Sequence, residues 1–301
     1  MMLSVIICTY NRAKYIGGLL ESIAQNDLSK ADYEVVLVDN NCTDNTREIC
    51  DGFAQAHQDI AFHYCVEPEQ GLSAARNKGI REAKGDVLVY VDDDALVDSW
   101  YLRTIWAYMN DNPQIQAVGG PIIPQYETAK PVWMTRYTEE LLGGYLYFGD
   151  KVRDFPAGRY PGGGNAAYRA AVFGRTGLFN TALGRKGDSL MGAEEKDIFD
   201  KMRTLGMRFM YLPQMVLHHL IPPKKLEQDY FDRLTLQIGR SERQRTRSLS
   251  KAKFLHRLGM EGVKWGGTLV LLAGYTMMGA PKKGWKLVLF RRNVTRGLLG
   301  R

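Results

Sequence analysis

Three consecutive aspartates, Asp92, Asp93 and Asp94, are the residues whose type and spacing point most directly to chemistry. They follow the apolar run 86–91, which is typical of a buried strand. Three carboxylates at one strand tip repel one another, and a hard divalent cation relieves that repulsion. A cation held in this way usually keeps open positions for phosphate oxygens. The triplet therefore predicts a cation site and a substrate that carries a diphosphate.

Short apolar segments alternate with amphipathic ones along the first 120 residues, and these elements must position the carboxylates. Strands are expected at 4–8, 34–38, 60–66, 86–91 and 115–118. Helices are expected at about 16–23, 46–56, 73–84 and 99–109, with Ser73 and Ser99 as caps of the last two. This order predicts an α/β fold with a mostly parallel sheet.

Polar residues collect where the expected strands end, which is the edge at which open parallel sheets bind ligands. Besides the aspartates, they are Thr9, Tyr10, Asn11 and Arg12 after the first strand, Asp39, Asn40 and Asn41 after the second, and Glu67 after the third. The chain has neither G-x-G-x-x-G after its first strand nor G-x-x-x-x-G-K-[ST]. A nucleotide would therefore have to be held by side chains and a metal.

The regular alternation stops between about 121 and 160, a stretch rich in proline, glycine and aromatic residues. A mobile loop over the site and a packed surface excursion are both consistent with this composition. The run PGGGN at 161–165 follows, and its glycines would let backbone approach a ligand or simply make a tight turn.

The segment GAEEKD at 192–197 opens an expected helix that ends near Gly206. Acidic residues at a helix start complement the helix dipole without any function. A carboxylate at this place could also take a proton from an attacking hydroxyl. Farther on, His218 and His219 follow a strand-like segment at 208–212, and adjacent residues of a strand face opposite sides. At most one of the two histidines is therefore expected to face the site.

Together these segments resemble the inverting glycosyltransferases of family 2, which have the GT-A fold. The resemblance covers roughly residues 3–247. It is carried by VIICTYNR at 5–12, VDN at 38–40, GLSAARN at 71–77, GDVLVYVDDD at 85–94, GGNAAYR at 163–169, LGR at 183–185, GAEEKD at 192–197, YLP at 211–213 and HLIPP at 219–223. It implies a Rossmann-like, mostly parallel central sheet flanked by helices, and a D-x-D motif at Asp92–Asp94.

The resemblance also implies a role for each matching residue. The donor nucleotide-sugar would be bound by Thr9, Tyr10, Asn11, Arg12, Asp39, Asn41, Arg76, Asp92 and Asp93. Asp94 would bind Mn²⁺ or Mg²⁺, with Asp92 and His219 as further ligands. Gly163, Gly164 and Asn165 would lie on the acceptor side. Glu195 stands where the family places its general base, often an aspartate, and Glu194 is the alternative.

The net charge of +7 is unevenly distributed. Residues 222–301 hold 18 lysines and arginines against 5 aspartates and glutamates, so the C-terminal part is strongly basic and the preceding part mildly acidic. We expect a catalytic domain at 1–221, with a nucleotide-sugar half at about 1–120 and an acceptor half at about 121–221. A basic, amphipathic helical extension would follow at 222–301.

A basic tail favours an anionic surface as partner. The apolar run 265–280 is shorter than the roughly 20 residues of a spanning helix. Basic residues mixed with bulky apolar ones follow it, which favours peripheral attachment to an anionic membrane. A spanning or re-entrant hairpin and an interface with a second copy remain open.

The four cysteines form no C-x-x-C pair, and the apolar start of the chain is too short for a secretory signal. We therefore expect a cytoplasmic enzyme on the inner face of the cell membrane. It would move a sugar, most often from UDP in this family, to a saccharide or lipid-linked saccharide in cell-surface polysaccharide synthesis. The rival hypotheses are a nucleotidyltransferase and an adaptor with an inactive body that binds a membrane or nucleic acid, of which nucleic acid is the less expected partner.

Overall fold

The computed structural model describes residues 1–186 and 193–301. The chain forms two compact units. The first consists of Met1–Gln125, Leu146–Thr181 and Glu195–Leu220, and the second of Tyr126–Tyr145, Ala182–Glu194 and Ile221–Arg301.

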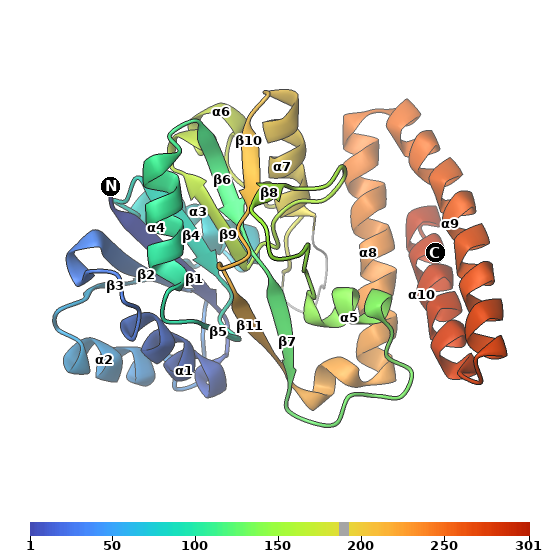
Figure 1. Ribbon diagram of the computed structural model, residues 1–301, viewed down its shortest axis with the longest axis horizontal. Helices are drawn as coiled ribbons and strands as arrows, with labels where there is room; N and C mark the ends of the chain where they lie inside the picture. Colours follow the sequence, from blue (N-terminus) through green and yellow to red (C-terminus); the bar gives the residue numbers. More distant parts are fainter. Residues whose placement is uncertain (187–192) are drawn as a thin grey trace. The chain divides into compact units, whose positions relative to one another are not determined.

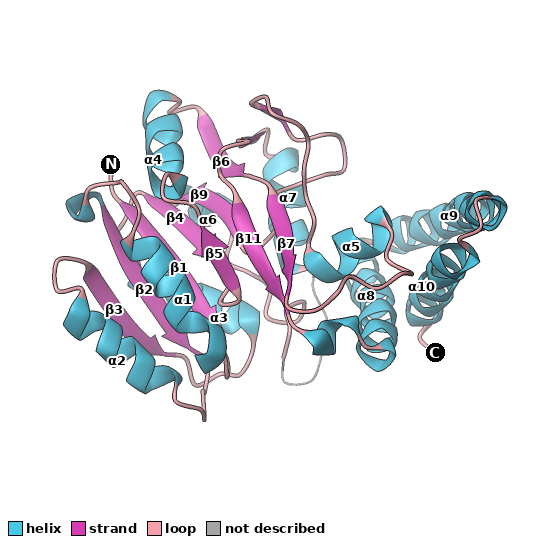
Figure 2. Cartoon of the chain, turned by 60° about the horizontal axis from the view of Figure 1, so that its bottom comes forward, coloured by secondary structure: helices cyan, strands magenta, loops and turns pink. Residues whose placement is uncertain are grey.

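The first unit is built on an eight-stranded sheet in the order β3-β2-β1-β4-β9-β6-β10-β8 (Figures 1 and 2). Its strands are β1 (Leu3–Thr9), β2 (Tyr33–Asp39), β3 (Ala61–Val66), β4 (Val87–Val91), β6 (Ile115–Gly119), β8 (Arg153–Asp154), β9 (Asn165–Arg169) and β10 (Arg208–Tyr211). The pairs among β3, β2, β1 and β4 are parallel, as is β6 with β10. The predicted α/β class with a mostly parallel sheet is confirmed, with β9 running antiparallel to β4 and β6.

Apolar side chains of the strands pack on both faces of this sheet, because neighbouring residues of a strand point to opposite sides. Val5 and Ile7 of β1 join one core with Ile16 of α1 (Ala13–Ala24), whereas Ile6 joins a second core with Ala75 and Phe199. The helices that contribute to these cores are α2 (Thr46–Ala56), α3 (Leu72–Glu82), α4 (Tyr101–Asp111), α6 (Ala171–Thr176) and α7 (Glu194–Thr204).

The register of the strands brings their polar ends together. Thr9 at the end of β1 pairs with Asp39 at the end of β2. Val91, which ends β4, pairs with Asn165, which begins the antiparallel β9. The glycine segment before β9 therefore meets the aspartates after β4, and the Asp92 amide donates to the carbonyl of Gly164 at 3.3 Å.

A three-stranded sheet, β5-β11-β7, places a further side chain next to the aspartates. It consists of β5 (Ala95–Val97), β7 (Ile122–Tyr126) and β11 (Leu217–Ile221). Strand β5 comes directly after Asp94 and was not predicted, because three residues are too few for a recognisable period. His219 of β11 pairs with Ala95 in antiparallel register, which carries the histidine to the aspartates.

Two predicted caps are wrong. Helix α3 begins at Leu72 and has Gly71 at its N-cap position, so Ser73 lies inside the first turn. Helix α4 has Trp100 rather than Ser99 at that position. Ser73 is therefore the second residue of α3, and Ser99 lies one residue before the N-cap of α4.

The second unit is helical. It contains α5 (Arg136–Gly143), the short 3₁₀ turn η2 (Pro223–Leu226), α8 (Gln228–Leu249), α9 (Lys251–Met277) and α10 (Pro281–Leu299). The stretch that breaks the alternation contains β7, β8 and α5, and α5 begins with a capping box of Thr135 and Thr138. Among the described residues, no helix combines the length and the apolar character that crossing a bilayer requires.

Candidate active site

The three aspartates after β4 differ in their surroundings. Asp94 is buried, with 4% of its surface exposed, whereas 46% of the Asp92 side chain is exposed. Asp93 lies between them and is largely enclosed. Burial and the neighbouring Asp94 carboxylate raise the pKa of Asp93 to about 7, although Arg12 acts in the opposite direction. The crowding of negative charge predicted for this strand end is therefore present.

Two basic side chains meet this crowded charge. Arg12, from the turn after β1, has its Nε 3.6 Å from Asp93 Oδ1 and its Nη2 3.6 Å from Asp94 Oδ2. Both separations exceed a direct hydrogen bond. His219 Nε2 lies 3.2 Å from Asp94 Oδ1. His218 lies on the other side of β11, and its Nε2 is 3.1 Å from Asp98 Oδ1. The two histidines therefore contact different carboxylates.

Arg76 of α3 joins the aspartates to the start of α7. Its Nη1 donates to Glu195 Oε1 at 2.7 Å, and its Nη2 lies 3.9 Å from Asp92 Oδ1. The guanidinium is 3% exposed and lies against the rings of Tyr90 and Phe179, at 5.8 and 5.5 Å from their centroids. This enclosure fixes one geometry for the arginine and, through it, for the Glu195 carboxylate.

The two glutamates at the start of α7 have different environments. Glu195 keeps 20% of its side chain exposed. Glu194 is 1% exposed, and its Oε2 accepts a hydrogen bond from the Ala193 amide at 2.9 Å. Glu194 therefore stabilises the helix start, which is the ordinary use of an acidic residue there. Gly192, which was expected to open this helix, lies outside the described residues.

The predicted glycines touch two of these carboxylates. A Cβ built on Gly163 would lie 1.8 Å from Glu195 Oε1, and one on Gly164 would lie 2.1 Å from Asp92 Oδ2. Any larger residue at either position would therefore force the neighbouring carboxylate to move. Asn165 is fully buried, and its amide donates to the carbonyls of Pro121 and Met215 at 2.8 and 3.1 Å. Its side chain joins the sheet to neighbouring backbone, and contact with an acceptor stays a prediction.

A second group of predicted residues gathers at the ends of β1 and β2. The Asp39 carboxylate accepts hydrogen bonds from the Cys42 amide, at 2.6 Å, and from the Tyr64 hydroxyl. Asn11 and Asn41 adopt positive φ angles of 55° and 70°. Such backbone is uncommon outside glycine but tolerated by asparagine.

The other predicted donor contacts lie in the same turns. The Asn11 Oδ1 accepts from the Thr43 amide at 2.7 Å, and the Asn41 amide donates to the Pro68 carbonyl at 3.1 Å. Tyr10 is 45% exposed, whereas Thr9 is buried and its hydroxyl has no hydrogen-bond partner of ordinary geometry. Asn11 and Asn41 therefore shape the turns, and the buried Thr9 hydroxyl lies beside Asp93.

Sequence reasoning missed Tyr64, Tyr90 and Phe179, which hold the predicted residues in place. The strand register places Tyr64 and Tyr90 beside these residues, and a contact distant in sequence places Phe179 there. No short sequence pattern indicates either arrangement. Within residues 1–186 and 193–301, no three histidine, cysteine, aspartate or glutamate side chains are grouped as a ready metal site. The nearest arrangement is the pair of Asp94 and His219.

Comparison with known proteins defines the class to which this fold and site belong. Residues 4–177 match the model of glycosyl transferase family 2, and this chain belongs to that family. It is therefore a glycosyltransferase. A glucosyl-dolichyl phosphate glucuronosyltransferase of Haloferax volcanii is 28% identical over 247 residues, which are 81% of this chain and 77% of the relative.

A further sequence relative and a solved structure are also similar to this chain. The succinoglycan biosynthesis protein ExoM of Rhizobium meliloti is 25% identical over 231 residues, 73% of this chain and 67% of that protein. Among solved structures, the mannosyltransferase PcManGT of Pyrobaculum calidifontis, in complex with GDP-Man and Mn²⁺, superposes with a TM-score of 0.64 at 20% identity. The superposition covers 99% of this chain and 87% of that one, which confirms the GT-A fold.

Proposed function

We propose that this glycosyltransferase is metal-dependent and inverting, and that it moves a sugar from a nucleotide-sugar to a hydroxyl of a saccharide or lipid-linked saccharide. The observation that carries the proposal is two sets of contacts that share the aspartates after β4. His219 contacts Asp94, and Arg76 contacts both Asp92 and Glu195. The proposed cation site at Asp94 and His219 and the proposed general base Glu195 then lie at the same edge of the sheet. UDP is the nucleotide we propose, from its frequency in the family.

The residues around Asp94 fit Mn²⁺ or Mg²⁺. A carboxylate and an imidazole, 3.2 Å apart, form a donor set that suits Mn²⁺, and Asp92 could add a second carboxylate. The remaining positions would be filled by diphosphate oxygens and water, as is usual for such cations. When bound, the cation would stabilise negative charge on the departing diphosphate.

Arg12 would take part in the same charge balance. Its guanidinium lies 3.6 Å from Asp93 and Asp94, so these contacts are loose. A cation on the aspartates would replace it there. Arg12 could then pair with a donor phosphate, which matches its fork of donors. Thr9, Tyr10, Asn11, Asp39 and Asn41 would hold the nucleoside beside it. The Cys42 amide and the Tyr64 hydroxyl hold the Asp39 carboxylate, which would accept a further hydrogen bond from a base N–H.

Glu195 is the general base in this proposal. It is more exposed than Glu194, and its Oε1 lies against Gly163, the segment we assign to the acceptor side. Its carboxylate would accept the proton of the acceptor hydroxyl while that oxygen attacks the anomeric carbon from the face opposite the nucleotide. Arg76 holds the carboxylate in place through the hydrogen bond from its Nη1.

The acceptor is proposed from the relatives. Similar proteins include a glucosyl-dolichyl phosphate glucuronosyltransferase, a poly(ribitol-phosphate) beta-glucosyltransferase and a succinoglycan biosynthesis protein. The first two names state a lipid-linked and a polymeric acceptor, and the third names a polysaccharide, which together support a saccharide or lipid-linked saccharide as the acceptor proposed here. We place the reaction in cell-surface polysaccharide synthesis, on the cytoplasmic face of the membrane.

A pair of isosteric substitutions tests the base. Glu195→Gln should bind the donor with unchanged affinity and lower kcat by about 10²–10⁴-fold, since it removes general-base catalysis alone. Glu194→Gln is the matched control on the same helix and should change kcat less than tenfold. Donor binding is measured by calorimetry and turnover by release of the nucleotide diphosphate. Near-normal turnover of Glu195→Gln would remove it as the base.

A further inference from the structure

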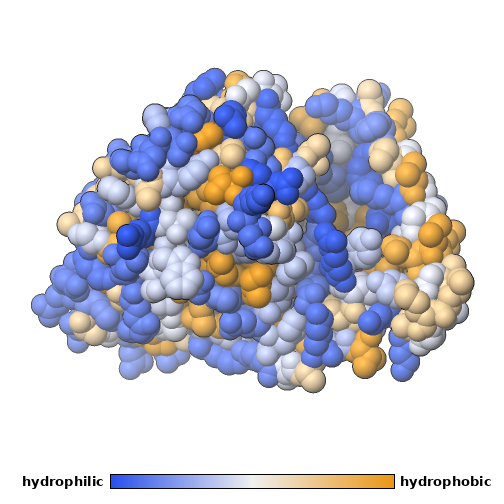
Figure 3. Space-filling model, viewed as in Figure 1, coloured by the Kyte–Doolittle hydropathy of each residue, from blue (hydrophilic) through white to orange (hydrophobic). Residues whose placement is uncertain are grey.

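Both buried residues of helix α9 are polar, whereas several of its large apolar side chains are exposed, which is unusual for a surface helix. Its two buried residues are Glu261 and Thr268. Leu255, Val263, Val270 and Met277 are 65, 67, 72 and 88% exposed. These four recur every seven or eight residues and so lie on one side of the helix, here called the α9 outer face. Apolar side chains gather along the α9 edge of the helical unit in Figure 3.

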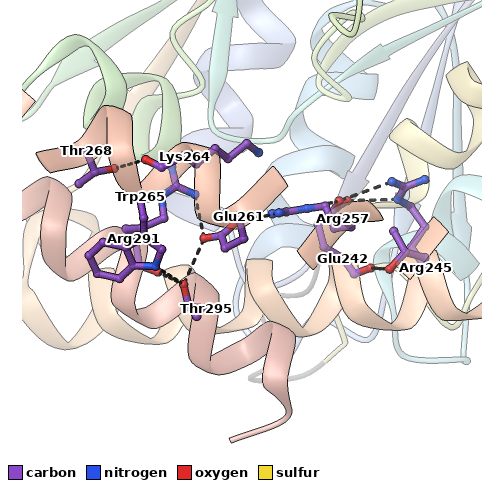
Figure 4. A network of polar contacts seen from close by, with 10 residues as sticks. Glu242, Arg245, Arg257, Glu261, Lys264, Trp265, Thr268, Arg291 and Thr295 are labelled. Carbon is purple, nitrogen blue, oxygen red and sulfur yellow. Dashed lines mark hydrogen bonds and ion pairs between the residues drawn. The ribbon is translucent and has the colours of Figure 1, made fainter. Parts of the chain in front are cut away.

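A network of charges holds this inverted orientation (Figure 4). Glu261 accepts from Arg257 at 2.7 Å and from Arg291 of α10 at 3.1 Å. Trp265 donates to Thr295 of α10 at 3.0 Å. Burial alone would raise the pKa of Glu261, but the two arginines outweigh it and lower that pKa. The polar side of α9 is therefore satisfied inside the unit, and rotating the outer face inward would break these bonds.

Packing within this chain does not explain why the α9 outer face is rich in apolar residues and glycine. A Cβ added to Gly259, Gly262 or Gly266 would meet nothing within 4 Å. Each glycine inside a helix costs about 0.5–1 kcal/mol relative to alanine. An apolar surface with such uncovered positions indicates an environment outside the chain that is itself apolar.

Charge identifies that environment. Residues 251–301 contain eleven lysines and arginines and one acidic residue, Glu261, which is 2% exposed. Every exposed formal charge of the side chains of α9 and α10 is therefore positive, including Lys253 and Lys282 near the two ends of α9. A second copy placed on this face would bring like charges together. An anionic bilayer offers an apolar interior and a complementary surface.

We propose that the α9 outer face inserts into the headgroup region of an anionic phospholipid bilayer, with the helix lying in the plane of the surface. Trp285, which is 58% exposed, and the neighbouring Met277, Met278 and Lys282 form the end of this contact at the α9–α10 turn. The contact would bring the enzyme to an acceptor that a lipid carries. It depends on no residue of the active site.

Vesicle flotation of the full chain tests the proposal without any donor or turnover. The vesicles contain phosphatidylcholine alone or mixed with phosphatidylglycerol. Wild-type protein should float with the mixed vesicles, and its binding should fall as salt screens the charges. The Val263→Asp/Val270→Asp variant should bind at least about 100-fold more weakly, because two apolar side chains no longer insert.

Val132→Asp/Val152→Asp is the matched control. These valines are 73 and 46% exposed and lie outside α9, so the control changes charge equally and should bind as wild type does. Unfolding midpoints should be the same for all three proteins. Equal flotation of the α9 variant, or equal binding to phosphatidylcholine alone, would overturn the proposal. So would a wild-type dimer that ignores vesicles and that the α9 variant dissociates. Donor binding by the same preparations reports separately on the proposed function.

Discussion

Adding one methyl group at Gly163 or Gly164 should damage catalysis while leaving the fold intact. The new Cβ would lie 1.8 Å from Glu195 Oε1 or 2.1 Å from Asp92 Oδ2. Non-bonded contacts of carbon with oxygen need about 3 Å or more, so the carboxylate must retreat by roughly 1 Å. A displacement of that size in a reacting group can cost about 10²-fold in rate. We therefore expect kcat to fall about 100-fold in Gly163→Ala.

The two variants should fail in different ways. Gly163→Ala displaces the proposed base and should leave donor affinity unchanged, whereas Gly164→Ala displaces Asp92 and should weaken binding of donor with Mn²⁺. Asp92 and Glu195 keep 46 and 20% of their side chains exposed, so each carboxylate can move toward solvent, and the unfolding free energy should change by no more than about 1 kcal/mol.

Calorimetric donor binding, nucleotide release and thermal unfolding measure these three quantities. Gly174→Ala in α6 is the control, because its Cβ would meet nothing within 4 Å. It should keep full activity. Full activity of Gly163→Ala would refute the argument that Glu195 must stay where the structure has it.

Two further predictions concern buried cations. Arg76→Lys should lower kcat about tenfold or more, since an ammonium cannot bridge Glu195 and Asp92 as the guanidinium does, and an unchanged kcat would contradict the positioning role. Burial lowers the pKa of Lys286 from its ordinary 10.5 to about 8, although its Nζ lies 4.0 and 3.9 Å from the ring centroids of Trp133 and Phe231, which favour the cation. The unfolded chain then binds more protons between pH 8 and 10.5, so the unfolding free energy should rise over that interval by up to about 3 kcal/mol. Chemical denaturation of Lys286→Met at the same pH values should show a flatter rise. Identical pH profiles for the two proteins would show that the lysine titrates normally in the folded state.

The strands and helices of the first 120 residues could be predicted because their apolar periods are clear. The parallel pairing of β1, β2 and β4 follows from the α/β alternation, and with it the meeting of Thr9, Asp39 and Asp92 at one edge. The antiparallel β9 could not be predicted in this way. Its place between β4 and β6 depends on long-range pairing, and that pairing is what brings Gly163 and Gly164 to the carboxylates.

Within the site, residue types could be predicted better than contacts. Alternation along a strand correctly indicated that His218 and His219 would face different sides. The sequence left Glu194 and Glu195 as alternatives, because neighbours in a first helical turn differ only in what packs around them. The reversed polarity of α9 was also hidden, since an apolar stretch next to basic residues does not indicate which side of the helix is buried.

The central claim, a cation held at Asp94 that binds the donor diphosphate, is tested most directly by thermal shift. Wild-type protein and Asp94→Asn are unfolded with a nucleotide-sugar, each with and without Mn²⁺. We predict that the donor raises the wild-type midpoint only when Mn²⁺ is present, as binding to the folded state requires, and that Asp94→Asn shows no such increase. An equal Mn²⁺-dependent shift in Asp94→Asn, or a full wild-type shift without any divalent cation, would contradict the claim.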